Sequence, residues 1–552
     1  MNRRDFLGRA ALFGALCMAR PSPAKAAKRP NIVLLLTDDQ SYRSMGCYGN
    51  AQVKTPNLDG LGADGVIFDA AYDTTAICMP SRAQVMTGMY EYKTGCNFSH
   101  GPLSEDKWTQ SYPVLLRKAG YYTGFVGKFG FSVKPNADDP SNYHHNEDLP
   151  IDSFDEWYGW PGQGSYKTKD NEFVAHYAMK YPHVTRTCGA VSQDFIKNAK
   201  EKDQPFCLSV SFKAPHGPMS PDPFFDDVYA DTKWQEPPNY DEKGAAHLPE
   251  QAKSGRQYLH INDFEPDRFQ GTMRKYNQLV YGIDYAVGMI RAELKRQDLA
   301  DNTVILFLTD NGYSCGAHAM GGKVLPYEEP SRSPMILYDP RHPVSGKGTR
   351  VKSVCGNIDM APTILDLAGI PIPGNMDGKS LMPLLDNPRD MVHDSILLIN
   401  AWGNAPTHSL AVVTDRYKYI HWPFAHDMEP AEELYHLVND RFEMINLAAH
   451  PDKQAVLKRM QKRYDESLAV WKSQCVDGGN YPLFGKIFDR HIPWHDKIAA
   501  MDSRMQRKYL QWRAEDKKLS SDGKKKEVSP EKRAAKAAAR AKRKAEQKQE
   551  GN

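Results

Sequence analysis

Two uninterrupted apolar runs constrain the fold of this chain more than any other feature. They are "NIVLLL" at residues 31–36 and "TVILFLT" at residues 303–309, and such runs are typical of parallel strands that are covered on both faces. An amphipathic stretch at residues 276–294 precedes the second run, with its apolar side chains on one helical face. A helix that leads into a buried strand is half of a β-α-β unit. We therefore expect an α/β domain with a large, mixed, mostly parallel sheet sandwiched by helices.

The pattern changes near residue 395. Short strand-like segments follow one another, and a helix is expected over about residues 451–472. The strand-like segments cover residues 395–400, 409–422 and 432–437. These features predict a smaller C-terminal antiparallel sheet with one packed helix. We expect a catalytic domain over residues 27–390 and a C-terminal α+β subdomain over residues 391–512.

The first 26 residues have the pattern of a bacterial twin-arginine signal peptide. "NRRDFLG" at residues 2–8 is followed by a short apolar run and by "AKA" before Ala27, which predicts cleavage near Ala26. The apolar run is too short to span a bilayer stably. The expected location is therefore periplasmic or secreted, with no membrane association after cleavage.

Charge is unevenly distributed along the chain. From Lys517 to Asn552 there are 13 Lys/Arg and 5 Asp/Glu, an excess of +8, and residues 1–26 contribute +4. Because the whole chain carries +3, the body between these ends carries −9, which agrees with a site built from carboxylates around a cation. The low-complexity tail, residues 513–552, is either a solvated end or a docking segment for a polyanion such as a sulfated polysaccharide or nucleic acid. For the protein itself no nucleic-acid partner is expected.

One cysteine has an unusual context. The chain has nine cysteines, without a C-x-x-C pair or zinc-like spacing, so neither a disulfide framework nor a zinc site is expected. In "TTAICMPSRAQVMTGMY", Pro80 and Gly88 favour a short helix over residues 80–87. Cys78 then lies at a helix N-terminus, where anions are favoured, and Arg82 adds a fixed positive charge.

Carboxylates follow both buried strands. Asp38 and Asp39 come after the first strand, and Asp310 and Asn311 come after the second. Ligands of open α/β sheets gather at the carboxyl ends of strands, so we expect these four side chains to lie together. Three carboxylates and an amide oxygen favour a hard cation, calcium or magnesium.

These segments resemble the type I sulfatase family of the alkaline-phosphatase-like superfamily. "CMPSRAQVMTG" matches its C-x-P-S-R signature, and "TDDQ", "APHGP", "TDNG" and "GGK" occur in the family's order. The resemblance extends from about Asn31 to Leu447. It implies a hydrolase for sulfate esters, with sulfated glycans as expected substrates.

The resemblance also implies roles for individual residues. A formylglycine-generating enzyme would oxidise Cys78 to formylglycine, whose hydrate attacks sulfur and then expels sulfate. Arg82 would fix that residue, while Lys128, His216 and Lys323 would bind sulfate and assist the leaving oxygen. The implied calcium ligands are Asp38, Asp39, Asp310, Asn311 and the modified Cys78.

The chain departs from the family at Gly130, where G-K-x-H is usual. The missing histidine is the favoured base for expelling sulfate. We therefore expect either an early burst of alcohol product followed by a slow rate, or rescue by His100 or His318, which we also consider as substrate contacts. The aromatic loop at residues 157–173 is either a pocket wall that stacks on sugars or ordinary packing.

Three functions remain open at this level. The first is a periplasmic sulfatase that acts on sulfated carbohydrate. The second is a phosphonate or phosphate ester hydrolase of the same superfamily, because some of those enzymes also use formylglycine. The third is a non-catalytic protein that binds sulfated glycans and has lost turnover at Gly130.

Overall fold

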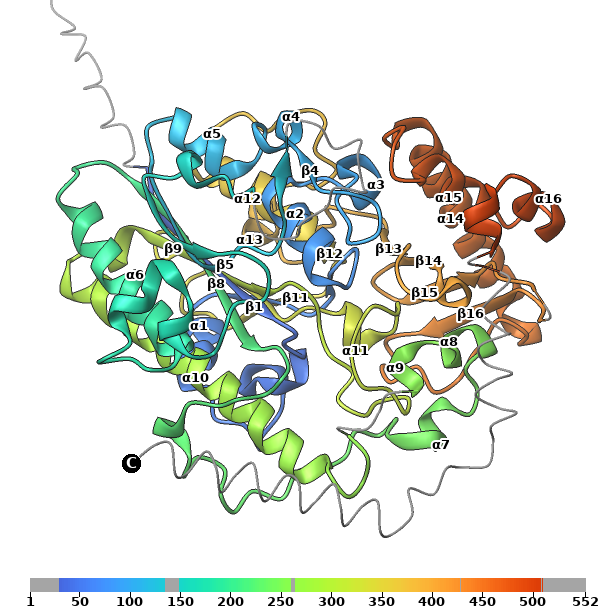
Figure 1. Cartoon of the computed structure of the whole chain (residues 1–552), viewed down its shortest axis with the longest axis horizontal. Helices are drawn as coiled ribbons and strands as arrows, with labels where there is room; N and C mark the ends of the chain where they lie inside the picture. Colours follow the sequence, from blue (N-terminus) through green and yellow to red (C-terminus); the bar gives the residue numbers. More distant parts are fainter. Residues whose placement is uncertain (1–28, 135–147, 260–263, 427, 508, 510–552) are drawn as a thin grey trace, which may run out of the picture.

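The computed structural model describes residues 29–134, 148–259, 264–426, 428–507 and 509, so the expected signal segment and basic tail lie outside the described residues. An eight-stranded sheet forms the centre of the molecule (Figure 1). In spatial order its strands are β11 (Thr349–Val351), β2 (Val66–Phe68), β10 (Met335–Tyr338), β9 (Thr303–Thr309), β1 (Asn31–Asp38), β8 (Phe206–Pro215), β5 (Tyr122–Lys128) and β7 (Glu156–Trp160). Only β10 runs antiparallel to its neighbours among these strands. The predicted large, mixed, mostly parallel sheet is confirmed.

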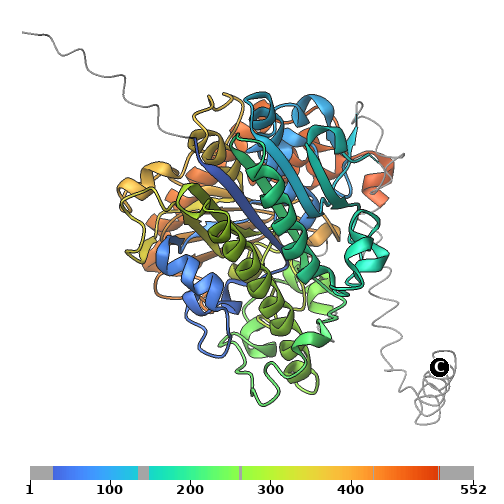
Figure 2. The same ribbon diagram turned by 90° about the vertical axis from the view of Figure 1, so that its left-hand side faces the viewer.

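Helices cover both faces of this sheet. Side chains of β1 alternate between two cores, with Leu34 in one and Leu35 in the other, because successive residues of a strand point to opposite faces. The helices α1 (Pro56–Asp64), α6 (Val184–Lys200) and α10 (Phe269–Arg296) cover one face. The helices α2 (Cys78–Thr87), α5 (Tyr112–Lys118) and α12 (Met360–Leu367) cover the other. Figure 2 shows α6 and α10 side by side in front of the sheet.

The C-terminal part is the predicted antiparallel sheet. Its four strands follow one another as a meander, and α14 (Gln454–Gln474) packs on it. The strands are β13 (Ile396–Asn400), β14 (Ser409–Val413), β15 (Tyr417–Trp422) and β16 (Ala431–His436). Two short helices that the sequence analysis did not identify, α15 (Tyr481–Ile487) and α16 (Trp494–Ala499), pack in the same cluster. The expected domain boundary after residue 390 lies just before β13.

Strand pairing brings distant segments to one edge of the large sheet. β1 and β9 pair in parallel with Thr37 opposite Thr309, so the residues that follow them emerge side by side. β8 lies on the other side of β1, and β5 follows it in the sheet. Within the described ranges, no helix has both the length and the apolar composition that a membrane span requires.

Candidate active site

Cys78 is the first residue of α2, two residues earlier than the sequence predicted. Ile77 carries the extended backbone at the N-cap, so Met79 is already helical although it precedes a proline. Pro80 is tolerated there because the N–H groups of the first helical turn have no intrahelical acceptor. The helix ends as predicted at Gly88, whose φ of +68° is in the left-handed region.

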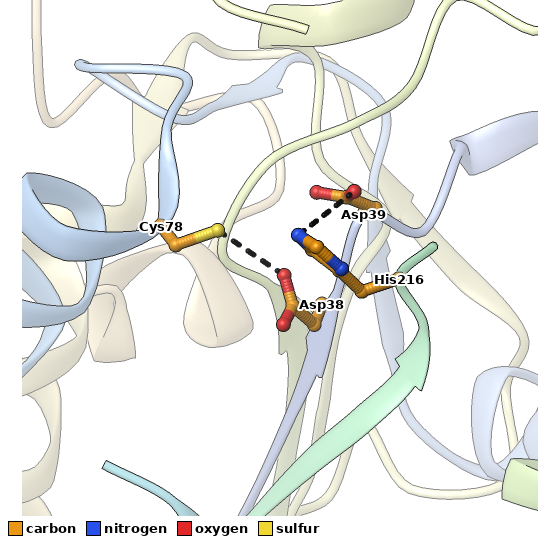
Figure 3. A group of neighbouring side chains, drawn as sticks. All are labelled: Asp38, Asp39, Cys78 and His216. Carbon is orange, nitrogen blue, oxygen red and sulfur yellow. Dashed lines mark hydrogen bonds and ion pairs between the residues drawn. The ribbon is translucent and has the colours of Figure 1, made fainter. Parts of the chain in front are cut away.

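The thiol of Cys78 is buried against a carboxylate and an ammonium group. Sγ lies 3.3 Å from Oδ1 of Asp38, and Nζ of Lys323 donates to Sγ at 2.7 Å. Figure 3 shows Cys78 facing Asp38, with Asp39 and His216 beside them. Burial, together with the neighbouring Asp38 carboxylate, raises the pKa of the Cys78 thiol to about 12. The thiol is therefore protonated near neutral pH, whereas a cysteine nucleophile must be a thiolate.

Asp38 is fully buried and faces three cations. Its Oδ2 lies 2.5 Å from Nζ of Lys128 and 3.7 Å from Nη2 of Arg82, and its Oδ1 lies 3.9 Å from Nζ of Lys323. Burial alone would raise the pKa of the Asp38 carboxyl, but the Lys128 ammonium and the neighbouring cations hold it well below its usual range. Asp38 is therefore ionised at physiological pH.

Asp39, Asp310 and Asn311 join Asp38 at the same edge of the sheet. Nε of Arg82 donates to Oδ2 of Asp310 at 2.7 Å, and Nδ2 of Asn311 donates to Oδ1 of Asp39 at 2.7 Å. Asp39 has a φ of +67°, a strained conformation for a residue other than glycine. Within the described residues, the buried Oδ1 of Asn311 accepts no hydrogen bond, so this oxygen is available to a ligand.

This donor set fits a hard divalent cation. It offers three carboxylates and an unpartnered amide oxygen, the ligand types that calcium and magnesium prefer. In the structure the positive charges of Arg82, Lys128 and Lys323 balance the three carboxylates. A divalent cation would therefore make the site net positive and favour an anionic substrate.

Lys323 and His216 approach the carboxylates from two other segments. Nζ of Lys323 also bonds to Oδ1 of Asp39. Burial alone would lower the pKa of Lys323, but Asp39 and the other nearby anions raise this pKa well above its usual value. Nδ1 of His216 donates to the Gly217 carbonyl at 2.5 Å, so Nε2 faces the site, 3.8 Å from Oδ2 of Asp39. Burial lowers the pKa of His216, which favours the neutral imidazole in the absence of substrate.

No side chain fits at Gly130. Its φ is +89°, and a Cβ atom there would lie 2.5 Å from Cδ of Arg82. The histidine that is usual in the family at this position is therefore incompatible with this backbone and with the placement of Arg82.

The structure places His100 and His318 in other surroundings. Nε2 of His100 bonds to the Ala401 carbonyl at 2.9 Å, and its ring packs edge-on against Phe484 of α15. Nδ1 of His318 donates to the Gly244 carbonyl at 2.7 Å, and its Nε2 lies 3.9 Å from Glu329. The bonds described for these two histidines are with residues other than those around Cys78.

Several residues beside the site were missed from the sequence. The hydroxyl of Ser211 accepts from Nη1 of Arg82 at 2.5 Å, and Gln163 accepts from Nζ of Lys128 at 2.8 Å. The Tyr166 hydroxyl donates to the His216 carbonyl at 2.7 Å, and the ring of Tyr166 faces Nζ of Lys213. Gln163 and Tyr166 belong to the aromatic loop at residues 157–173, and the composition of this loop was the one feature of the sequence that pointed to them.

The tryptophans of that loop have a packing role. Trp157 and Trp160 are at least nine-tenths buried, and the ring of Trp157 stacks on Phe125 with centroids 5.0 Å apart. Ordinary packing is therefore the correct interpretation for these two rings.

Two family models match the chain. The model described as Sulfatase matches residues 30–370, and the model described as N-sulphoglucosamine sulphohydrolase, C-terminal, matches residues 316–469. The first range contains every residue of the site around Cys78, and the second contains the four-stranded sheet.

Individual proteins are also similar. An N-acetylglucosamine-6-O-sulfatase of Bacteroides thetaiotaomicron is 27% identical over 541 residues, which cover 86% of this chain and 92% of that protein. A solved protein in complex with its substrate D-glucosamine-2-N,6-O-disulfate is similar with a TM-score of 0.65 and 24% identity, over 81% of this chain and 98% of that one. A phosphonate monoester hydrolase of Agrobacterium radiobacter has a TM-score of 0.66 and 23% identity, over 81% and 96% of the two chains. At these identities the two solved structures show a shared fold.

Proposed function

Since the chain belongs to the sulfatase family, whose model matches residues 30–370, we propose that this sulfatase hydrolyses sulfate esters of carbohydrates with Cys78 as a formylglycine and with a bound calcium ion. The observation that carries the proposal is the placement of Cys78. It lies at the start of α2, 3.3 Å from Asp38 and 2.7 Å from Lys323, at the edge where β1 and β9 end.

The thiol of Cys78 supports conversion to another group. With a pKa of about 12 the thiol is a poor nucleophile at neutral pH. It lies between the Asp38 carboxylate and the Lys323 ammonium group, which could accept a hydrogen bond from an oxygen nucleophile and donate one to it. The hydrate of formylglycine would supply one hydroxyl as the oxygen nucleophile, and loss of the proton from its second hydroxyl would break the bond from carbon to the sulfate oxygen, release sulfate and restore the aldehyde. The proposed calcium ligands are Asp38, Asp39, Asp310, Asn311 and the modified Cys78, and calcium supplies charge that polarises the attacking oxygen.

The remaining residues of the site act on the sulfate group. Lys128, His216 and Lys323 present positive charge or a proton to its oxygens and stabilise the charge that develops in the transition state. An arriving sulfate anion favours the imidazolium form of His216, which then donates its Nε2 proton to the leaving alcohol oxygen. Arg82 donates to Asp310 at 2.7 Å and to the Lys128 carbonyl at 2.9 Å. It therefore holds the segments that carry Asp310 and Lys128 in place.

The proposed substrate class is sulfated sugar, and the first member to test is an N-acetylglucosamine 6-sulfate. A relative with that printed activity aligns with 86% of this chain. The experiment is a sulfate-release panel on defined sulfated mono- and oligosaccharides, with matched phosphonate and phosphate esters in the same assay. Sulfate release that is absent from the whole panel would overturn the proposal.

Mass spectrometry tests the nucleophile directly. The peptide that contains Cys78, taken from active enzyme, should have the mass of formylglycine, while the peptide that contains the buried Cys96 should keep its thiol. Cys78→Ala should abolish turnover and keep the fold. Fully active protein with an unmodified Cys78 would exclude this nucleophile.

A phosphonate or phosphate ester hydrolase is the alternative. The sulfatase family model favours sulfate, and the phosphonate hydrolase shares the fold at 23% identity. Faster turnover of phosphonate esters than of sulfate esters would favour the phosphonate hydrolase over the sulfatase.

Location and maturation are part of the proposal. The twin-arginine pattern at residues 1–26 supports export to the periplasm or beyond, and cell fractionation with N-terminal sequencing tests cleavage near Ala26. A formylglycine-generating enzyme is the proposed maturation partner. Its co-expression should raise the formylglycine content at residue 78.

A further inference from the structure

Lys213 is a buried cation without a carboxylate partner. It lies on β8, and its residue surface is 4% exposed. Across the residues that the structure describes, its Nζ makes no ion pair or hydrogen bond, and it faces the ring of Tyr166, whose centroid is 5.0 Å away. Lys128 and Lys323 differ in this respect, because each bonds to an aspartate.

An uncompensated buried ammonium group is unfavourable. A cation–π contact offsets only part of the cost of removing the charge from water. Burial lowers the pKa of Lys213, while Asp38 opposes this and the Lys128 ammonium adds to it. The groups that act on Lys213 are therefore those of the active site, yet none of them pairs with it.

Strand register places Lys213 beside the sulfate-binding residues. In the parallel pairing of β5 and β8, Gly127 lies opposite Ser211, and in that of β1 and β8, Asp38 lies opposite Pro215. Lys213 lies between these two positions of β8. It is two residues beyond Ser211, whose hydroxyl bonds to Arg82, and lies in the stretch where the register of β1 and β8 shifts.

Gly130 leaves this side of the site without a histidine. It follows β5 closely, and its missing side chain cannot be replaced because of the contact with Arg82. The end of β5 therefore contributes Lys128 alone to the cations around the sulfate position, and β8 offers a further one.

We propose that Lys213 binds an oxygen of the substrate's sulfate group, in addition to Lys128, His216 and Lys323. The inference rests on the proposed function, because the sulfate supplies the counter-charge that the protein withholds. In a buried site such a charge-assisted hydrogen bond is stronger than a neutral one. Lys213 would then be a specificity-determining residue for an anionic tetrahedral group.

Binding of inorganic sulfate to the calcium-loaded full-length enzyme tests this assignment by calorimetry. Lys213→Met should weaken sulfate binding by about tenfold to about a hundredfold, the effect of losing one hydrogen bond to a charged group. Lys213→Arg, which keeps the charge, should retain most of the affinity. Lys200→Met on the exposed face of α6 is the matched control and should bind sulfate like the wild type.

The melting temperature separates binding from folding. Lys213→Met should melt at the same temperature as the wild type or higher, because it removes an unpaired buried charge. If Lys213→Met is destabilised, Lys213→Arg decides: retained sulfate affinity supports the assignment, and lost affinity in a folded protein overturns it.

Unchanged affinity in Lys213→Met, with wild-type enzyme that hydrolyses a sulfate ester, overturns the role of Lys213 and leaves the proposed function intact. Wild-type protein that neither binds sulfate nor hydrolyses sulfate esters overturns both.

Discussion

Gly130 and Arg82 are so close that a Cβ atom at position 130 would lie 2.5 Å from Cδ of Arg82. Arg82 is held in place, because its guanidinium group donates to Asp310, to the Ser211 hydroxyl and to the Lys128 carbonyl at 2.5 to 2.9 Å. The left-handed φ of +89° at Gly130 adds a second reason for glycine.

Substitution at Gly130 should therefore lower activity. Gly130→Ala and Gly130→His should both reduce kcat/KM on a sulfate ester, by about 10²-fold if Arg82 moves by roughly 1 Å. Gly120→Ala is the matched control: its φ is +85°, but its Cβ would meet no heavy atom nearer than 3.9 Å. A gain of activity in Gly130→His would show that the pocket accepts the usual histidine after all.

Sulfate release should be slower than the attack step. Lys128, His216 and Lys323 are all in place for attack, whereas no histidine stands at position 130. Loss of a positioned base costs about 10²–10⁴-fold on the step that it serves. Quenched-flow measurement with a chromogenic sulfate should show a burst of alcohol product followed by a slower steady rate.

His100→Ala and His318→Ala should leave that burst and its following rate unchanged in folded protein. Both histidines bond to backbone carbonyls away from Cys78. Linear product formation from the first turnover in the wild type would indicate that another group accepts the proton efficiently.

Calcium should stabilise the protein through the carboxylates. Asp39→Asn should lose the ion and activity together, because it removes one charged oxygen ligand and makes the site more positive by one charge. Asp39 is a better choice than Asp310, whose removal would also leave the buried Arg82 without its 2.7 Å partner.

Metal analysis and melting temperatures measured with and without added calcium check this prediction. The wild type should melt at a higher temperature with calcium, and Asp39→Asn should show no shift. Asp194→Asn on α6, where the carboxylate pairs with Lys197 near the surface, should respond like the wild type. Stoichiometric zinc in active wild-type enzyme would contradict the oxygen-ligand assignment.

The meeting of Asp38 with Asp310 was predictable from the sequence. Each follows an apolar run, and parallel strands end at one edge of a sheet, so a rule about strands was enough although 272 positions separate them. Cys78 was predictable for a different reason, because its signal is a local motif. The predicted start of its helix was two residues too late. A residue before proline tends to avoid helical backbone, but the first turn of a helix tolerates proline because its N–H groups have no intrahelical acceptor.

Ser211 and Lys213 could not be predicted in the same way. Their placement depends on β8 lying between β1 and β5, an order that no local pattern contains. The necessity of glycine at position 130 depends on a side chain from α2, almost 50 residues earlier. Contacts of this kind follow from sheet order and helix packing, and they require the three-dimensional structure.

The C-terminal subdomain contains a buried neutral histidine. His421 lies on β15, and neither of its ring nitrogens has a hydrogen-bond partner within the described ranges. Burial, together with the positive charges of Lys497 and Arg490, lowers the pKa of His421 to about 3. In the unfolded chain the pKa of a histidine is about 6.5.

Acid should therefore destabilise this subdomain. Between about pH 6.5 and about pH 3 the unfolded state binds a proton at His421 that the folded state does not, so stability falls as the pH falls through this range and is unaffected above it. The largest possible loss is about 1.4 kcal/mol per pH unit. His421→Met should flatten this decline, whereas His495→Met, at an exposed position, should leave it unchanged.

Urea unfolding followed by tryptophan fluorescence at several values between pH 7 and pH 4 provides the measurement, because Trp422 and Trp471 are buried in this subdomain. Equal acid sensitivity in the wild type and His421→Met would assign the loss of stability to other groups.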